Sequence, residues 1–339
     1  MLDRLKEICM ISGVSGEEDL VADYITGQIG DKAQVTRDNL GNLLVFKTGK
    51  RRPNRKIMIC AHMDEIGFII TGVTEDGMLR FAAVGGIDAR VVIGRSVKVG
   101  AAGYGGVVGT KPIHLQSDAE RGSVPAIDTL YIDIGAESKD DALAHISLGD
   151  RAVFTSDFLV FGDGMLKAKA LDDRAGCAIM LDMIDSELEY DVHFAFTVQE
   201  EIGLRGAKAA AYSINPDMAI VLETTTAADI TGVEADKQVC RLGAGPVVSF
   251  MDRATIYDKK LYSLAFETAR ELDIPCQTKT MVAGGNDSGA VHVSAGGVRT
   301  VAVSMPCRYI HSASCVIKIT DMEQTKLLAV RMLEKMSEL

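Results

Sequence analysis

The stretch IMICAHMDEIGF, residues 57–68, begins with an apolar run and continues with one histidine and two acidic residues. The run Ile57–Ala61 is typical of a buried strand, and His62, Asp64 and Glu65 follow where that strand should end. Burying such groups without partners costs free energy. These three side chains therefore need partners, which must come from other parts of the chain.

The sequence differs in character on the two sides of this stretch. Apolar residues recur at helical spacing over residues 2–10 and 17–29, and Ser15 with Glu18 forms a possible capping box between them. A hairpin is expected within residues 33–46. Between about 67 and 160, short β-type runs are separated by glycines, which favours a small barrel or sandwich.

After Lys167 helical and strand patterns alternate again. We expect an α/β domain, residues 1–66 and 161–339, interrupted by an inserted β-barrel domain, residues 67–160. The chain of 339 residues is long enough for both. The expected helices are 174–186, 206–213, 257–272 and 321–339, and the expected strands 192–197, 218–222 and 298–303.

Composition limits the possible partners. With 47 acidic and 36 basic residues the net charge is −11, which disfavours nucleic acid and anionic membranes. The absence of tryptophan argues against a stacking platform. The opening MLDRLKEICMISG lacks the apolar core of a signal peptide, and seven scattered cysteines form no C-x-x-C pair. These features indicate a cytoplasmic protein with reduced thiols.

Histidine or acidic residues stand at five expected strand ends, namely His62, Asp172, the pair Glu200 and Glu201, Glu223, and His311. Taken singly, His62 could be a core histidine with an ion pair, and Asp172 could cap the following helix. The adjacent carboxylates at 200 and 201 repel each other, and no cation follows before Arg205. Because open α/β sheets bind ligands at the carboxyl edge of their strands, all five positions together predict one site.

Oxygen and imidazole groups without thiolate suit Zn²⁺, or the similar ions Co²⁺ and Mn²⁺. Three carboxylates and two histidines are more than one tetrahedral ion needs. Two metal ions that share a bridging carboxylate are therefore expected. The charges agree, since two dications, three carboxylates and one hydroxide come close to neutral.

These motifs resemble the M42 family of metallo-aminopeptidases, which includes TET peptidases, glutamyl aminopeptidases and proteins often labelled cellulase M or endoglucanase. The resemblance covers essentially the whole chain. It implies a mixed-sheet metallopeptidase domain with helices on both faces and an inserted small β-barrel that serves oligomerisation. The motifs that carry it are Ser12–Glu18, His62–Gly67, Lys169–Arg174, Gln199–Gly206, Gly284–Gly289 and Arg308–Ser312.

The resemblance also implies roles for individual residues. Glu200 would be the general base, and Asp64, a second catalytic residue, would orient the ring of His62. The position of Glu223 is more usually aspartate in this family. The two metal ions would be held by His62, Asp172, Glu201, Glu223 and His311, with Asp172 shared by both.

Two further acidic residues, Glu65 and Asp287, each have two possible roles. Glu65 is either part of the site or a solvated neighbour. Asp287 either shapes the pocket or stabilises its glycine-rich turn.

The resemblance and the chemistry together imply removal of N-terminal residues from small peptides by a metal-bound hydroxide. The alternatives are a glycan hydrolase, a deacylase or carboxypeptidase of related fold, and a non-catalytic binding protein, for which Glu200 would have no purpose. Homo-oligomers from dimers to dodecamers are implied, and the segment Leu115–Ile127 either reaches a neighbouring site or is an ordinary exposed loop. The preferred N-terminal residue stays open, since the net charge disfavours acidic peptides at long range but one local lysine or arginine could reverse that.

Overall fold

The structure, a computed structural model, describes all 339 residues and is built around an eight-stranded mixed sheet of order β1-β2-β12-β3-β13-β16-β14-β15. Its four central strands run parallel and are β12 (Val192–Thr197), β3 (Ile57–His62), β13 (Met218–Thr226) and β16 (Arg299–Cys307). The flanking strands are β1 (Gln34–Arg37), β2 (Leu43–Lys47), β14 (Val247–Val248) and β15 (Gln277–Thr278). Strands β1, β2 and β14 pair antiparallel with their inner neighbours, and β15 pairs parallel with β14.

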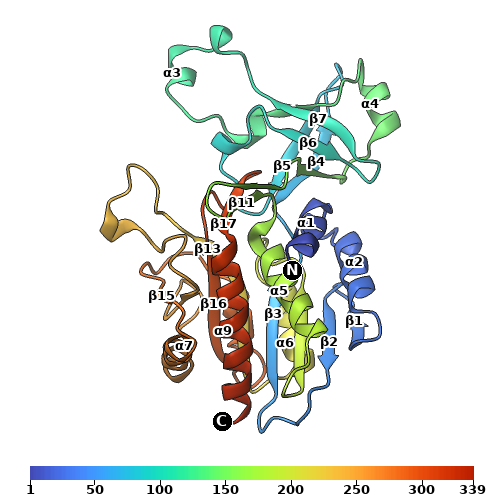
Figure 1. The fold of residues 1–339 in the computed structure, drawn as a ribbon. Coiled ribbons are helices and arrows are strands. Elements are labelled where there is room, and N and C mark those ends of the chain that lie inside the picture. Colours follow the sequence, from blue (N-terminus) through green and yellow to red (C-terminus); the bar gives the residue numbers. More distant parts are fainter.

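Helices cover both faces of this sheet, as Figure 1 shows. None of them combines the length and the apolar character that crossing a membrane requires. One face carries α1 (Leu2–Met10), α2 (Asp19–Ile29), α5 (Leu171–Asp185), α7 (Lys259–Glu271) and α9 (Ile319–Ser337). The other face carries α6 (Arg205–Ile214) and α8 (Ser288–Val291).

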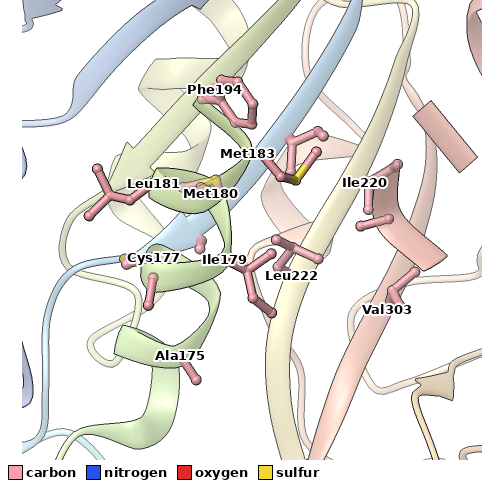
Figure 2. Packing of buried hydrophobic residues seen from close by; sticks show 14 of the residues in the cluster. Ala175, Cys177, Ile179, Met180, Leu181, Met183, Phe194, Ile220, Leu222 and Val303 are labelled. Atoms are coloured by element: carbon pink, nitrogen blue, oxygen red, sulfur yellow. The ribbon is translucent and has the colours of Figure 1, made fainter. Parts of the chain in front are cut away.

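Strand β3 shows why the sheet needs helices on both sides. Ile57 and Ile59 belong to the core under α5, whereas Met58 and Cys60 belong to the core under α6. Successive side chains of a strand point to opposite faces, so an uninterrupted apolar run must be covered twice. Figure 2 shows the first core, in which side chains of α5 pack against β12, β13 and β16.

Between β3 and α5 the chain forms a closed six-stranded barrel with a core of its own. The ring of Phe68 contacts the rings of Phe81 and Phe154 edge-on, with centroids 4.8 and 5.2 Å apart. The predicted fold class, an α/β domain with a small barrel, is confirmed. In barrel order the strands are β4 (Gly67–Val73), β5 (Leu79–Val84), β8 (Tyr131–Asp133), β7 (Tyr104–Gly109), β6 (Ser96–Val99) and β9 (Arg151–Phe154).

Short elements complete the fold. The barrel carries α3 (Asp118–Arg121) and α4 (Lys139–His145), and α3 lies on a long excursion away from the sheet (Figure 1). A three-stranded sheet of β10 (Leu159–Phe161), β11 (Met165–Ala168) and β17 (Cys315–Lys318) joins the end of the barrel to α5 and α9.

The structure differs from the expected elements at the end of β13 and at the start of α2. Within the barrel, Asp88 caps a 3-10 helix, Ala89–Val91, and β6 begins at Ser96. Strand β13 continues to Thr226, because it pairs with β16 over nine positions, so Glu223 lies within a strand rather than after it. Helix α2 starts at Asp19 without a side-chain cap, since Ser15 bonds elsewhere.

A buried cation joins three parts of the main core. Arg174 of α5 is fully buried, and it donates hydrogen bonds of 2.6 Å to the carbonyl oxygens of Met63 and Ile8. Its neighbour Glu65 is 2% exposed and accepts a 2.6 Å bond from Lys169. The interpretation of Glu65 as a solvated neighbour is therefore wrong, because its ion pairs with Lys169 and Arg174 hold it in the protein interior.

Arg174→Met should lower the free energy of unfolding by about 3 kcal/mol, because it leaves buried carbonyl oxygens unpaired and removes a cation beside Glu65. Urea denaturation followed by circular dichroism measures this change. Arg331→Met is the matched control, since Arg331 is half exposed on α9 and pairs only with Glu334 of the same helix. An unchanged unfolding midpoint for Arg174→Met would contradict the assignment.

Candidate metal centre

The five predicted ligands lie together as two groups that share one residue. In the first group, Nε2 of His62 lies 3.4 Å from Oδ1 of Asp172 and 3.5 Å from Oε1 of Glu223. In the second, Nε2 of His311 lies 3.4 Å from Oδ2 of Asp172 and 3.4 Å from Oε2 of Glu201. Asp172 therefore presents one carboxylate oxygen to each histidine.

Neighbouring segments at the carboxyl edge of the sheet bring these residues together. His62 is the last residue of β3, and Glu223 lies near the end of the adjacent β13. Asp172 stands at the start of α5, before the regular helical turns begin. Glu201 and His311 come from the segments that follow β12 and β16. An open α/β sheet places ligand sites at this edge.

Burial and charge act against each other at the two histidines. Burial lowers the pKa of His62, but the carboxylates of Glu223, Asp172 and Asp64 outweigh it and hold the pKa well above its usual value. Burial also lowers the pKa of His311, and Asp172 and Glu201 outweigh it to raise that pKa to about 10. The centre thus carries excess negative charge that favours a bound cation, either a proton or a metal ion.

Unpartnered oxygen atoms test whether metal ions suit this centre. Oδ1 of Asp172 and Oε1 of Glu201 are buried and have no hydrogen-bond partner. Such atoms are rare in folded proteins because leaving them unsatisfied costs free energy. Each belongs to a residue of the two groups, and the donors are oxygen and imidazole nitrogen without thiolate. The residues therefore fit divalent ions such as Zn²⁺, Co²⁺ or Mn²⁺.

Asp64 connects His62 to the loop that holds the acidic pair. Its side chain is fully buried, and Oδ1 lies 3.5 Å from Nδ1 of His62. The backbone N–H groups of Glu200 and Glu201 donate to the same carboxylate at 3.0 and 3.2 Å. The hydroxyl of Ser15 donates to it at 2.6 Å. Nδ1 of His62 also lies 3.1 Å from the backbone carbonyl oxygen of Asp64. Together these contacts direct Nδ1 away from the centre and leave Nε2 facing the other ligands.

Sequence reasoning missed the role of the N-terminal segment Ser12–Glu18. Ser15 bonds Asp64 instead of capping a helix, and the buried Glu18 accepts from the backbone N–H of Gln199 at 3.1 Å. Gln199 has a φ of 56°, so this contact holds an unfavourable backbone conformation just before the acidic pair. The only sequence signal was the presence of both residues in one of the family motifs.

A loop of the barrel also contacts the centre. The carbonyl oxygen of Gly86, which follows β5, lies 2.9 Å from Nδ1 of His311. The adjacent Gly85 has a φ of 88°, and a Cβ atom there would lie 2.6 Å from Ile66 and 3.3 Å from Glu201. Glycine at this position therefore lets the barrel loop approach closely enough to orient the second histidine.

A cavity of about 240 Å³ opens onto the centre and is lined by Glu200 as well as by the five ligands. The Glu200 carboxylate belongs to neither group, and it forms no hydrogen bond or ion pair. Burial, with repulsion from Glu223 and Asp287, raises its pKa well above the usual value. Glu200 thus supplies a carboxyl group that lines the cavity and has no partner within the chain.

Asp287 lies behind this cavity rather than in its wall. It is fully buried and accepts a hydrogen bond from the hydroxyl of Thr197 at the end of β12. Burial raises the pKa of Asp287 to about 6. The turn bond proposed for it is made instead by Asn286, which accepts from the backbone N–H of Ser288. Asp287 therefore makes no side-chain bond in the turn, and it does not line the cavity directly.

Comparisons with known proteins agree with this geometry. Residues 41–328 match the family model described as M42 glutamyl aminopeptidase. The lysyl aminopeptidase of Pyrococcus furiosus is 32% identical, over 98% of this chain and 96% of that protein.

Two solved structures show the same fold. Aminopeptidase APDkam598 of the archaeon Desulfurococcus kamchatkensis superimposes with a TM-score of 0.93 at 34% identity, over 98% of this chain and 94% of that chain. The TET1 peptidase of Pyrococcus horikoshii, which can assemble into a tetrahedron or a large octahedral shell, gives 0.86 at 37% identity, over 97% and 98% of the two chains.

Ser15→Ala should weaken zinc binding about tenfold, because Asp64 then loses the donor that helps to hold it against His62. Competition with a chromogenic chelator, starting from metal-free protein, measures the affinity. Ser213→Ala is the control, since Ser213 is exposed on α6 and makes no side-chain hydrogen bond. Equal zinc affinity in the Ser15→Ala variant and the wild type would show that this contact does not support the centre.

Proposed function

The chain belongs to the M42 family of aminopeptidases, and on that premise we propose that it removes N-terminal residues from small peptides with two divalent metal ions and Glu200 as general base. The resemblance of its motifs to this family is confirmed. The observation that carries the finer proposal is the position of Asp172, which offers one oxygen to each of two histidine-containing groups.

Each of the two groups of side chains described above would hold one ion. His62, Asp172 and Glu223 would hold one ion, and Asp172, Glu201 and His311 the other. When bound, the ions supply Lewis acidity, which polarises the peptide carbonyl and lowers the pKa of the attacking water. We propose Zn²⁺ as the ion, with Co²⁺ or Mn²⁺ as substitutes of similar ligand preference.

Glu200 has the position and the freedom that a general base needs. Its carboxylate lines the same cavity as the ligands, and no other group of the chain pairs with it. It would take a proton from the attacking water and pass that proton to the leaving amine. Asp64 would act through His62, keeping Nε2 of the ring directed at the centre.

The charge of the cavity explains a preference for free N-termini. Carboxylates attract the ammonium group of a peptide N-terminus, whereas an internal peptide bond offers no such group. The glycan hydrolase alternative has no comparable support, because a glycosidase uses a carboxylic acid and a carboxylate across a sugar rather than a ligand set shared by two histidines.

We further propose that the barrel, residues 67–160, is an inserted domain through which copies of the chain assemble, from dimers up to dodecamers. The assemblies of the related TET1 peptidase support this. Exposed apolar side chains on the barrel also support it, among them Ile113, Leu115 and Val124 on the excursion that carries α3. A cytoplasmic location fits the seven free cysteines.

The proposed function is tested with metal-free protein that is reconstituted separately with Zn²⁺, Co²⁺ or Mn²⁺ and offered amino-acyl anilides. We expect no hydrolysis without metal and recovery on reconstitution, because the unpartnered carboxylate oxygens then acquire ions. A cellulose oligomer and an acylated amino acid are assayed in parallel. Hydrolysis of either one in place of the anilides would overturn the aminopeptidase assignment.

The two adjacent glutamates should respond differently to the same substitution. Glu200→Gln should reduce turnover about 10²- to 10⁴-fold with metal content near that of the wild type, because the amide cannot accept the proton. Glu201→Gln should lose metal as well as turnover, because it removes a charged ligand. Metal analysis beside kinetics distinguishes them, and a Glu200→Gln protein that loses its metal ions would reverse the assigned roles.

A further inference from the structure

The segment Ala283–Asn286 lines the cavity in front of the metal centre but belongs to neither group of ligands. It is fastened at both ends. The ammonium of Lys279 donates to the carbonyl oxygen of Ala283 at 2.8 Å. Asp287, the residue that follows the segment, accepts from the hydroxyl at the end of β12, the strand that leads to Glu200. The segment therefore forms a fixed wall beside the loop that carries Glu200.

The side-chain amide of Asn286 has a defined orientation at this wall. Its Oδ1 accepts from the backbone N–H of Ser288 at 2.9 Å and lies 3.4 Å from the hydroxyl of Tyr257. Tyr257 in turn donates to the buried carboxylate of Asp252 at 2.6 Å. Because the N–H of Ser288 needs an acceptor, these contacts identify the oxygen of the amide and anchor it in the interior.

The amide nitrogen of Asn286, by contrast, has no partner in the chain. Neither of its N–H groups donates to another atom of the protein, although the residue is only 5% exposed. Buried donors without a partner are rare in folded proteins. The nitrogen is not fully enclosed by protein atoms, and Asn286 lines the cavity, so its N–H groups are available to a molecule bound there.

The other lining groups show which part of a peptide needs such a donor. Four carboxylates line the cavity and accept hydrogen bonds, whereas a peptide carbonyl oxygen also only accepts and needs an N–H or O–H group. Apart from the two histidines, only Asn286 and Lys279 carry side-chain N–H groups at the cavity, and Lys279 already binds Ala283. The cavity of about 240 Å³ is smaller than pockets for drug-sized ligands, roughly 300–1,000 Å³. A terminal residue bound at the centre therefore also contacts this wall.

We propose that the side-chain amide of Asn286 donates a hydrogen bond to the carbonyl oxygen of the N-terminal residue, the carbonyl that water attacks. This inference rests on the proposed aminopeptidase function and adds a catalytic residue to it. When the water oxygen bonds to the carbonyl carbon, the π electrons of the C=O bond move onto the carbonyl oxygen and a proton of the water passes to Glu200. A fixed, neutral donor stabilises that developing negative charge without neutralising the carboxylates around it.

Two substitutions test the donor on the zinc-loaded protein. Asn286→Asp keeps the acceptor for Ser288 but has no N–H group, whereas Asn286→Ala removes the donor without adding a charge. The substrate is alanyl anilide, which has one carbonyl group and no polar side chain. We expect both variants to lower kcat about a hundredfold with KM nearly unchanged, because the bond strengthens as the oxygen gains charge. Zinc content should equal that of the wild type.

A binding measurement supplies a readout that does not depend on turnover. Calorimetry with 1-aminoethylboronic acid, whose tetrahedral form resembles the attacked carbonyl, should show weaker binding to both variants than to the wild type. Asn39→Asp is the matched control, because Asn39 is exposed in the turn between β1 and β2 and makes no side-chain hydrogen bond. Its kinetics and boronic acid affinity should equal those of the wild type.

Several results would overturn the inference while leaving the proposed function intact. A loss of turnover in Asn286→Asp alone would reflect the added charge, and a loss in Asn286→Ala alone would reflect the missing bond to Ser288. Unchanged kcat in both variants, a rise in KM alone, or loss of zinc from both would equally contradict a donor to the attacked carbonyl. A wild type that hydrolyses no anilide overturns the proposed function as well.

Discussion

The concentration of negative charge at one edge of the sheet is the constraint on which the rest of the structure depends. Buried carboxylates repel one another, so the protein must hold them without neutralising them. It does this mainly through backbone position, at the ends of strands and at the start of a helix. The cations nearest in the core, Lys169 and Arg174, pair with Glu65 and not with the centre. The centre therefore keeps its charge for ions and substrate.

The N-terminal segment and the barrel loop bring the remaining parts into place. Ser15 reaches Asp64, and Glu18 reaches the turn before Glu200, so a segment far away in sequence fastens two strand ends to each other. The carbonyl oxygen of Gly86 likewise connects the barrel to His311. The metal centre is thus assembled from the sheet, the N-terminal segment and the barrel together.

The sequence predicts the parallel strands and the five clustered side chains, because long apolar runs such as Ile57–Ala61 and Met218–Leu222 show where buried strands lie. It does not predict how far β13 continues, because that length depends on pairing with β16. The sequence does not predict the contact of Ser15, because Ser15 and Glu18 have the pattern of a local helix cap. In the structure the hydroxyl of Ser15 bonds instead to Asp64, 49 positions away. The carbonyl of Gly86 could not be predicted, since every residue has such a group.

The contact between Gly86 and His311 has a consequence for regulation. Strand β5 leads directly into the loop that orients this histidine, so any conformation of the barrel that moves the loop would also change the affinity of the second group for an ion. Thermodynamic linkage makes this effect reciprocal. Suppose that subunits associate through the barrel, and that metal binding and association favour the same conformation of the loop. Metal binding then raises the affinity between subunits by the same factor by which association raises the affinity for the metal. The metal supply could then control the quaternary structure, and the quaternary structure could control how firmly the metal is retained.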